Sequence, residues 1–178
     1  MFNPKERREG VGEKDATREA RPRCVGQALV GPHAVDDARG EAAAAEDLAA
    51  HREAQGLAAM AVSLEAVVDE FGSGEPGPHA VRDFLAFAFH RWQAPSPRYV
   101  LLLGDASYDP KGHLVGTSRP DLIPSLFTKS TFLWTPADPL FAAVNGTDSL
   151  PDIAIGRINA ATLAEAQVAV QKILDFES

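Results

Sequence analysis

The chain has 178 residues, enough for one domain of ordinary size, and 45% of them are apolar, which places it outside the compositional range of disordered proteins. The net charge is −8, and the residues after Gly40 carry 18 acidic against 9 basic side chains, so no basic stripe is present to bind a nucleic acid. No apolar run approaches the ~20 residues that a membrane-spanning helix needs.

The first 40 residues are predicted to be a poorly ordered N-terminal segment. Their charges are mixed, Gly and Pro recur, and only "CVGQALV" could form a short strand. The opening residues lack the apolar region of a secretory signal. Cys24 is the sole cysteine of the chain, so no internal disulfide forms, and no surrounding pattern marks it as a nucleophile. Residues 41–178 are predicted to form one ordered α/β subdomain.

Helices and strands alternate along that subdomain. Apolar spacing and turn residues predict helices over 40–56, 64–71, 78–92 and 159–177, and strands over 57–63, 98–105 and 151–158. Thr162 and Glu165 form a candidate capping box for the last helix. Residues 128–149 are predicted to be irregular. The strands are continuous apolar runs, as in a parallel sheet covered on both faces. The expected fold class is therefore α/β, with a mostly parallel sheet flanked by helices.

Open α/β sheets bind ligands beyond the carboxyl ends of their strands. Asp105 follows the strand "RYVLLLGD" and is a candidate site-shaping residue, although a carboxylate there could equally cap its own loop. Arg157 ends a later strand and could hold a carboxylate, most simply an internal one such as Asp105. Ser107 with His113 gives an alternative serine hydrolase site, at a spacing that no known triad pattern supports.

Residues 144–152, "VNGTDSLPD", place amide and acidic oxygens in a turn-rich segment. Asn145 and Asp148 are weak candidates for binding a hard cation, which needs about six oxygens. A tight Asn-Gly turn is the alternative interpretation. No Gly-rich phosphate loop stands between a strand and a helix, so nucleotide binding is not expected.

Several phrases in succession, "PRYVLLLGDASYD", "LIPS", "ADPLFAAVNGTDSLPDIAIGRI" and "LAEAQVAVQKILDFE", resemble the gingipain family of cysteine peptidases. The resemblance runs from about Ala43 to Glu177 and implies a caspase-like half-domain, a peptide or protein substrate, and a secreted or cell-surface location. It implies no required cofactor; calcium occurs in the family, but the diluted acidic turn here does not support it.

In that family the catalytic His, within a Gly-His-Gly, and the nucleophilic Cys follow the helix that ends this chain. Neither motif is present here, so the resemblance implies a domain truncated before its C-terminal half, and inactive without that half. By position, Asp152 matches the carboxylate that orients the catalytic His. Glu165 lies near the acidic floor of the S1 pocket in Arg-specific members. Two other functions remain open: a non-catalytic α/β interaction or assembly module at the cell surface, and a serine hydrolase using Ser107.

Overall fold

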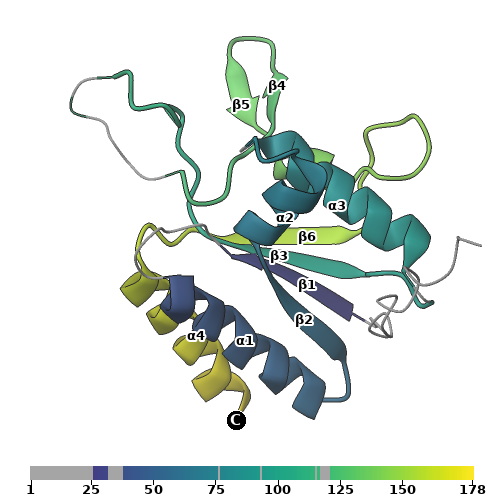
Figure 1. Cartoon of the computed structure of the whole chain (residues 1–178), viewed down its shortest axis with the longest axis vertical. Helices are drawn as coiled ribbons and strands as arrows, with labels where there is room; N and C mark the ends of the chain where they lie inside the picture. The colour runs from purple at the N-terminus through teal and green to yellow at the C-terminus, as the bar shows by residue number, and fades with distance from the viewer. Residues whose placement is uncertain (1–25, 32–37, 76, 93, 115, 117–120) are drawn as a thin grey trace, which may run out of the picture.

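The computed structural model describes residues 26–31, 38–75, 77–92, 94–114, 116 and 121–178. A four-stranded parallel sheet, in the order β2-β1-β3-β6, lies between two helical layers (Figure 1). Its strands are β1 (Gly26–Gly31), β2 (Ala58–Ser63), β3 (Tyr99–Leu103) and β6 (Ala154–Ile158). The helices are α1 (Ala38–Ala54), α2 (Leu64–Phe71), α3 (Pro78–Arg91) and α4 (Leu163–Glu177). The predicted α/β class with a parallel sheet is confirmed.

The helices begin where local side chains satisfy their first amides. The Ser63 hydroxyl accepts a hydrogen bond from the Ala66 amide at 3.2 Å and begins α2. Pro78 occupies the first turn of α3, where its missing N–H leaves no partner unsatisfied. Thr162 caps α4. None of the helices in the described ranges has the length and apolarity to cross a membrane.

The sheet separates two apolar cores. One lies under α2 and α3 and contains Leu85, Leu102 and Phe141 among its buried members. The other lies under α1 and α4, on the opposite face, around Leu48 and Leu103. The two helices of this second layer are also joined at their ends, where Arg52 pairs with the Glu177 carboxylate and His51 lies 3.0 Å from it. This three-layer arrangement accounts for the continuous apolar strands, because both faces of β3 are covered.

A long excursion connects β3 to β6. It contains a loop, a hairpin of β4 (Phe127–Lys129) and β5 (Trp134–Pro136), and the 3-10 helix η1 (Asp138–Phe141). The segment 128–149 was predicted to be irregular, and the hairpin and η1 correct that prediction. Strands of three residues are too short to show the alternation of polar and apolar side chains by which a sequence reveals a strand.

The boundary expected after Gly40 is too late for the sheet. β1 pairs with both β2 and β3, and α1 begins at Ala38. β1 coincides with most of "CVGQALV", the short strand considered possible within the N-terminal segment. Residues 1–25, Cys24 among them, and residues 32–37 lie outside the described residues, so the predicted poor order of that part stays a prediction.

Candidate functional site

The carboxyl ends of β3 and β6 lie side by side. Beyond the strand ends the pairing continues, because the Gly104 amide donates to the carbonyl of Ile158 at 2.9 Å and the Asp105 amide donates to that of Ala160 at 2.8 Å. The register places Leu102 opposite Arg157. Asp105 and Arg157 therefore lie at the same border of the sheet, where open α/β folds place their sites.

Gly104 permits an unusually close approach of a second segment. Its φ is +149°, and a Cβ at this position would lie 2.8 Å from Cγ1 of Ile123 and 3.2 Å from Cβ of Leu122. That contact is held by the main chain, since the Leu122 and Ile123 amides both donate to the Asp105 carbonyl, at 3.0 and 3.1 Å. Any larger residue would separate the strand end from the segment that packs on it.

Arg157 binds three segments of this border with one guanidinium. Nε and one terminal nitrogen donate to the two carboxylate oxygens of Asp138, at 2.7 and 3.0 Å. The other nitrogen donates to the carbonyls of Gly104 (2.9 Å) and Ile123 (2.8 Å), and a fifth bond reaches Pro124 at 3.3 Å. These five bonds match the five donors of a guanidinium, and the side chain is only 9% exposed. Arg157 is therefore a fully bonded brace.

The anion that neutralises Arg157 is Asp138, not Asp105 as the sequence suggested. Asp138 also accepts a hydrogen bond from the Ser125 hydroxyl at 2.8 Å. Burial by itself would raise the pKa of Asp138, but the hydrogen bonds and positive charge of Arg157 outweigh it, so that the pKa lies below its ordinary value. Sequence reasoning missed Asp138 because it stands in a 3-10 turn 19 residues from its partner, where no local pattern links the two.

The polar residues after β3 fold their own loop. The Asp105 carboxylate accepts from the adjacent Ala106 amide at 2.9 Å. Asp109 accepts from the amides of His113 and Leu114, at 2.9 and 2.5 Å, and these bonds lower its pKa. Both interactions fit the loop-capping alternative considered for this segment.

Ser107 is buried, with 8% of its surface exposed. Its amide donates to the Asp121 carboxylate at 2.8 Å, and its hydroxyl oxygen accepts from the Asp109 amide at 3.1 Å. Within the described ranges no hydrogen bond joins Ser107 to a histidine, which an activated serine requires. The arrangement favours a role for Ser107 in the loop.

Asp152 lies at the opposite end of the sheet. It stands two residues before β6, and Ala154, the first residue of that strand, pairs with Tyr99 at the start of β3. Asp152 therefore does not share a border with Asp105 and Arg157, because β6 runs its whole length between Asp152 and that border. At its own end, Asp152 accepts from the Val144 and Asn145 amides, at 2.9 and 2.8 Å, through one carboxylate oxygen.

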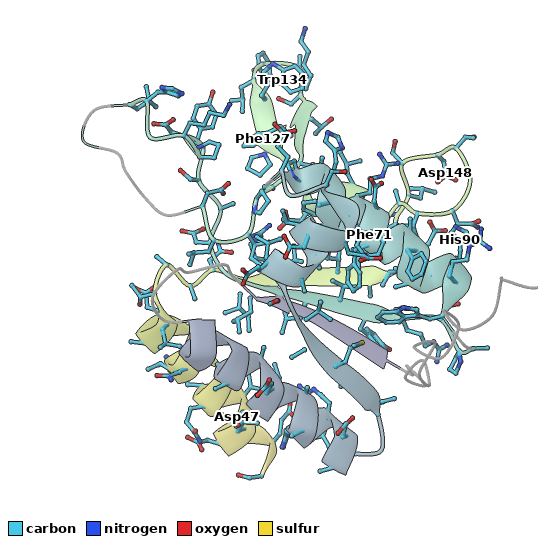
Figure 2. All side chains as sticks on the ribbon, viewed as in Figure 1. Asp47, Phe71, His90, Phe127, Trp134 and Asp148 are labelled. Atoms are coloured by element: carbon cyan, nitrogen blue, oxygen red, sulfur yellow. The ribbon has the colours of Figure 1, made fainter. Side chains whose placement is uncertain are left out.

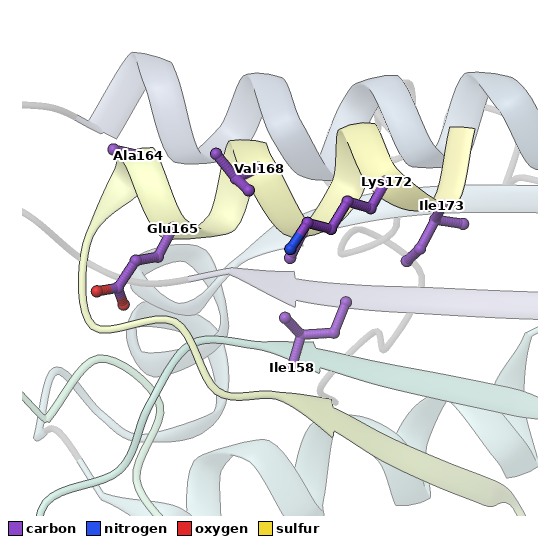
Figure 3. Close-up of a pocket in the computed structure, with 7 residues that line it drawn as sticks. Ile158, Ala164, Glu165, Val168, Lys172 and Ile173 are labelled. Carbon is purple, nitrogen blue, oxygen red and sulfur yellow. The ribbon is translucent and has the colours of Figure 1, made fainter. Parts of the chain in front are cut away.

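Glu165 lies on the carboxyl side, in the first turn of α4. Its amide donates to the Thr162 hydroxyl at 3.3 Å, while its carboxylate accepts from the Ala161 amide at 2.8 Å. This is a variant of the capping box, in which the Glu165 carboxylate binds the amide of Ala161 instead of that of the N-cap residue Thr162. Glu165 also contributes to the wall of an open groove of about 560 Å³ between β6 and α4, which is otherwise mostly apolar (Figure 3). Its carboxylate lies beside the turn that enters α4.

In the loop at residues 144–152, which was considered as a cation site, polar groups form hydrogen bonds with one another. Asp148 accepts from the Leu150 amide at 3.1 Å, and the Asn145 amide is bound by Asp152. Nearby, His90 of α3 donates from Nε2 to the Val144 carbonyl at 2.9 Å (Figure 2 labels His90 and Asp148). In the part of the chain that the structure describes, no three His, Cys, Asp or Glu side chains gather as metal ligands. The binding of a cation by Asn145 and Asp148 stays a prediction.

Comparison with known families decides the relationship. The sequence model of peptidase family C25 matches residues 30–178. The chain belongs to peptidase family C25. This membership confirms the resemblance to the gingipains that the sequence phrases indicated. A search of curated proteins finds no match.

Solved structures share the fold of this C25 chain. Dimeric latent PorU from Porphyromonas gingivalis matches with a TM-score of 0.64 and 24% identity, over 84% of this chain and 15% of that one. The complex of the RgpB pro- and mature domains from the same organism matches with a TM-score of 0.55 and 14% identity, over 84% of this chain and 28% of that one. The caspase-like fold is thus confirmed, and the chain spans only a small part of the length of either structure.

Proposed function

We propose that this C25 chain is the scaffold half of a cysteine peptidase domain that hydrolyses peptide bonds when its other half is present. The match of the C25 family over residues 30–178 carries this proposal. In the complete domain a Cys thiolate attacks the scissile carbonyl to form an acyl-enzyme, and a His transfers the proton to the departing amine. Both residues come from the second half, and this chain alone is inactive.

The scaffold contributes rigidity at the carboxyl border. Catalytic groups must be held to within about 0.5 Å of their productive positions, which requires support from packed and hydrogen-bonded neighbours. Arg157 supplies that support, because it fixes the end of β3, the 122–125 segment and η1 relative to one another. A second half that docks here meets a preformed surface.

Asp152 and Glu165 are the two residues proposed for the chemistry itself, with Asp152 orienting the imidazole and Glu165 binding a basic substrate side chain. They lie toward opposite ends of β6, a strand of five residues and therefore about 16 Å long. One compact site does not contain both. The carboxyl-side position favours Glu165 as the residue near the substrate. Asp152 orients a His only if the second half reaches the amino border.

Complementation of peptidase activity tests the proposal. The chain is incubated with fluorogenic Arg- and Lys-containing peptides, alone and together with a separately produced C25 segment that carries the Gly-His-Gly and the Cys. We expect turnover only in the mixture. Turnover by the chain alone that Cys24→Ala abolishes would show that the nucleophile lies in this chain. Failure of the mixture although the two halves bind would favour the non-catalytic module.

Two variants then separate the proposed roles. Glu165→Gln should raise KM for Arg peptides by about tenfold or more, because a charged partner is lost, while kcat changes little. If Asp152 orients the His, Asp152→Asn should lower kcat. If Asp152 only anchors the loop through the Val144 and Asn145 amides, the variant should lower the free energy of unfolding and leave kcat unchanged. Labelling by a fluorophosphonate that Ser107→Ala removes would instead support the serine hydrolase.

We also propose a secreted or cell-surface location, as the gingipain relationship implies, with a protein substrate and no required cofactor. Fractionation of cells that produce the protein, followed by immunodetection with a cytoplasmic marker as control, tests the location. Recovery with that marker alone contradicts it.

A further inference from the structure

The β4–β5 hairpin projects from the body of the molecule (Figure 1). Two contacts fix its base. The Ala137 amide donates to the Leu126 carbonyl at 2.7 Å. The Phe127 ring packs edge-on against the Tyr108 ring, with 5.9 Å between the ring centroids. Trp134 lies toward the far end of the hairpin (Figure 2). A firmly held base presents the turn to the surroundings.

The far end of the hairpin is apolar. Phe132, Leu133 and Trp134 are 92%, 59% and 58% exposed. Phe132 and Leu133 stand in the turn between the two strands, and Trp134 begins β5, so the three gather at one end of the hairpin. An apolar phase that surrounds this end removes all three side chains from water.

The turn satisfies its own polar groups. The Ser130 amide donates to the Leu133 carbonyl at 2.9 Å, and the Ser130 hydroxyl donates to the same carbonyl at 2.7 Å. The hydroxyl oxygen also accepts from the Leu133 amide at 3.2 Å. The main-chain cost of leaving water, which keeps most loops out of lipid, is thereby reduced at this tip.

Charge points the same way. Residues 122–136 contain no Asp or Glu and one basic residue, Lys129, although the chain as a whole carries −8. We propose that the tip of the β4–β5 hairpin inserts into the interface of a phospholipid bilayer, with Phe132 and Leu133 among the upper acyl chains and with Trp134 and its strand partner Lys129 at the boundary between acyl chains and headgroups. Trp beside aliphatic residues is the composition found at membrane interfaces. The acidic body disfavours a strongly anionic surface, so zwitterionic lipid suffices and the binding is driven by apolar burial.

Trp134 reports its own insertion. In the Trp92→Phe variant, Trp134 is the remaining tryptophan, and addition of phosphatidylcholine vesicles should shift its emission to the blue. Vesicles with brominated acyl chains should quench it, and high salt should leave the shift intact. An unchanged spectrum together with no co-sedimentation overturns the proposal, as does binding without quenching.

Surface variants locate the contact. Phe132→Ser with Leu133→Ser should lower the vesicle partition coefficient by about tenfold or more. The matched control is Val168→Ser with Phe176→Ser, which removes two exposed apolar side chains from α4 and should change partitioning less than twofold. Circular dichroism confirms folding of each variant. Equal losses in the two pairs, or tip-dependent binding to protein with none to vesicles, contradict insertion.

Discussion

Arg157 joins main-chain segments that are far apart in sequence, and its loss should be felt as lost stability. Arg157→Met leaves the half-buried Asp138 carboxylate without its cation and three carbonyls without donors. We expect the free energy of unfolding to fall by about 3 kcal/mol, as for other buried pairs broken on one side. Urea denaturation measures it. Arg52→Met, which breaks the more exposed pair with Glu177, is the control and should cost under about 1 kcal/mol.

The same ion pair should make stability fall in acid. Burial opposes ionisation of Asp138, but Arg157 prevails and the folded-state pKa is lowered. A group with a lowered folded pKa contributes stability above its unfolded pKa, about 4, and loses that contribution as the pH falls through the folded value. The stability difference between the wild type and Asp138→Asn should therefore shrink below about pH 4. Urea denaturation at a series of pH values tests this.

The stability difference between the wild type and Asp138→Asn does not contain the contribution of Glu177, the second carboxylate with a lowered pKa. Arg52 first, then Gln55 and His51, lower the pKa of Glu177 to about 2, and this carboxylate is present in both proteins. A difference that stays constant from neutral pH to pH 3 would contradict a depressed pKa at Asp138.

Gly104 should not tolerate a side chain. Gly104→Ala places a Cβ 2.8 Å from Ile123 at a φ of +149°, so backbone strain and a clash add together. We expect a loss of about 2–4 kcal/mol in the free energy of unfolding, read from thermal and urea denaturation. Gly112→Ala, also at positive φ but facing open space, should lose only about 1 kcal/mol. Equal losses would mean that the close approach does not matter.

At the scale of single elements, the start of α4 tests whether Glu165 serves the helix cap or the substrate. Thr162→Ala removes the acceptor for the Glu165 amide and should cost about 1 kcal/mol, as N-cap substitutions do. Glu165→Gln keeps an oxygen for the Ala161 amide and should cost less than about 0.5 kcal/mol. Urea denaturation of both variants checks this order. A larger loss for Glu165→Gln would assign its negative charge to stability rather than to substrate.

The elements themselves were largely predictable from sequence, because their signals are local. Val81, Phe84 and Leu85 recur at helical spacing and are buried, and the apolar run at 99–103 forms β3. The partner of Arg157 was not predictable, since it depends on how the β3–β6 excursion returns. The role of Asp152 was expected from the family resemblance, whereas its place follows from the strand itself: Asp152 precedes the strand that Arg157 ends, and the two ends of one strand lie at opposite borders of the sheet.

At the scale of the whole molecule, the two cores share one sheet and should unfold together. Leu48→Ala opens a cavity in the core under α1 and α4, and Leu85→Ala opens one under α2 and α3. Each should cost about 2–5 kcal/mol. Trp92, which packs on Phe84 in the core under α2 and α3, should report the Leu48→Ala transition at the same midpoint as far-ultraviolet circular dichroism. Separate midpoints would show two independently folding layers.

The brace at Arg157 also bears on how relatives of this chain can differ in length. It fixes the excursion that follows β3 at Gly104 and at Ile123, so a change of length between these two residues need not disturb the sheet. Extending a loop whose ends are already fixed costs only about 0.6 kcal/mol for each doubling of its length. The loop at residues 109–114 can therefore accept inserted segments, and new specificities, while the strand ends beneath it stay unaltered.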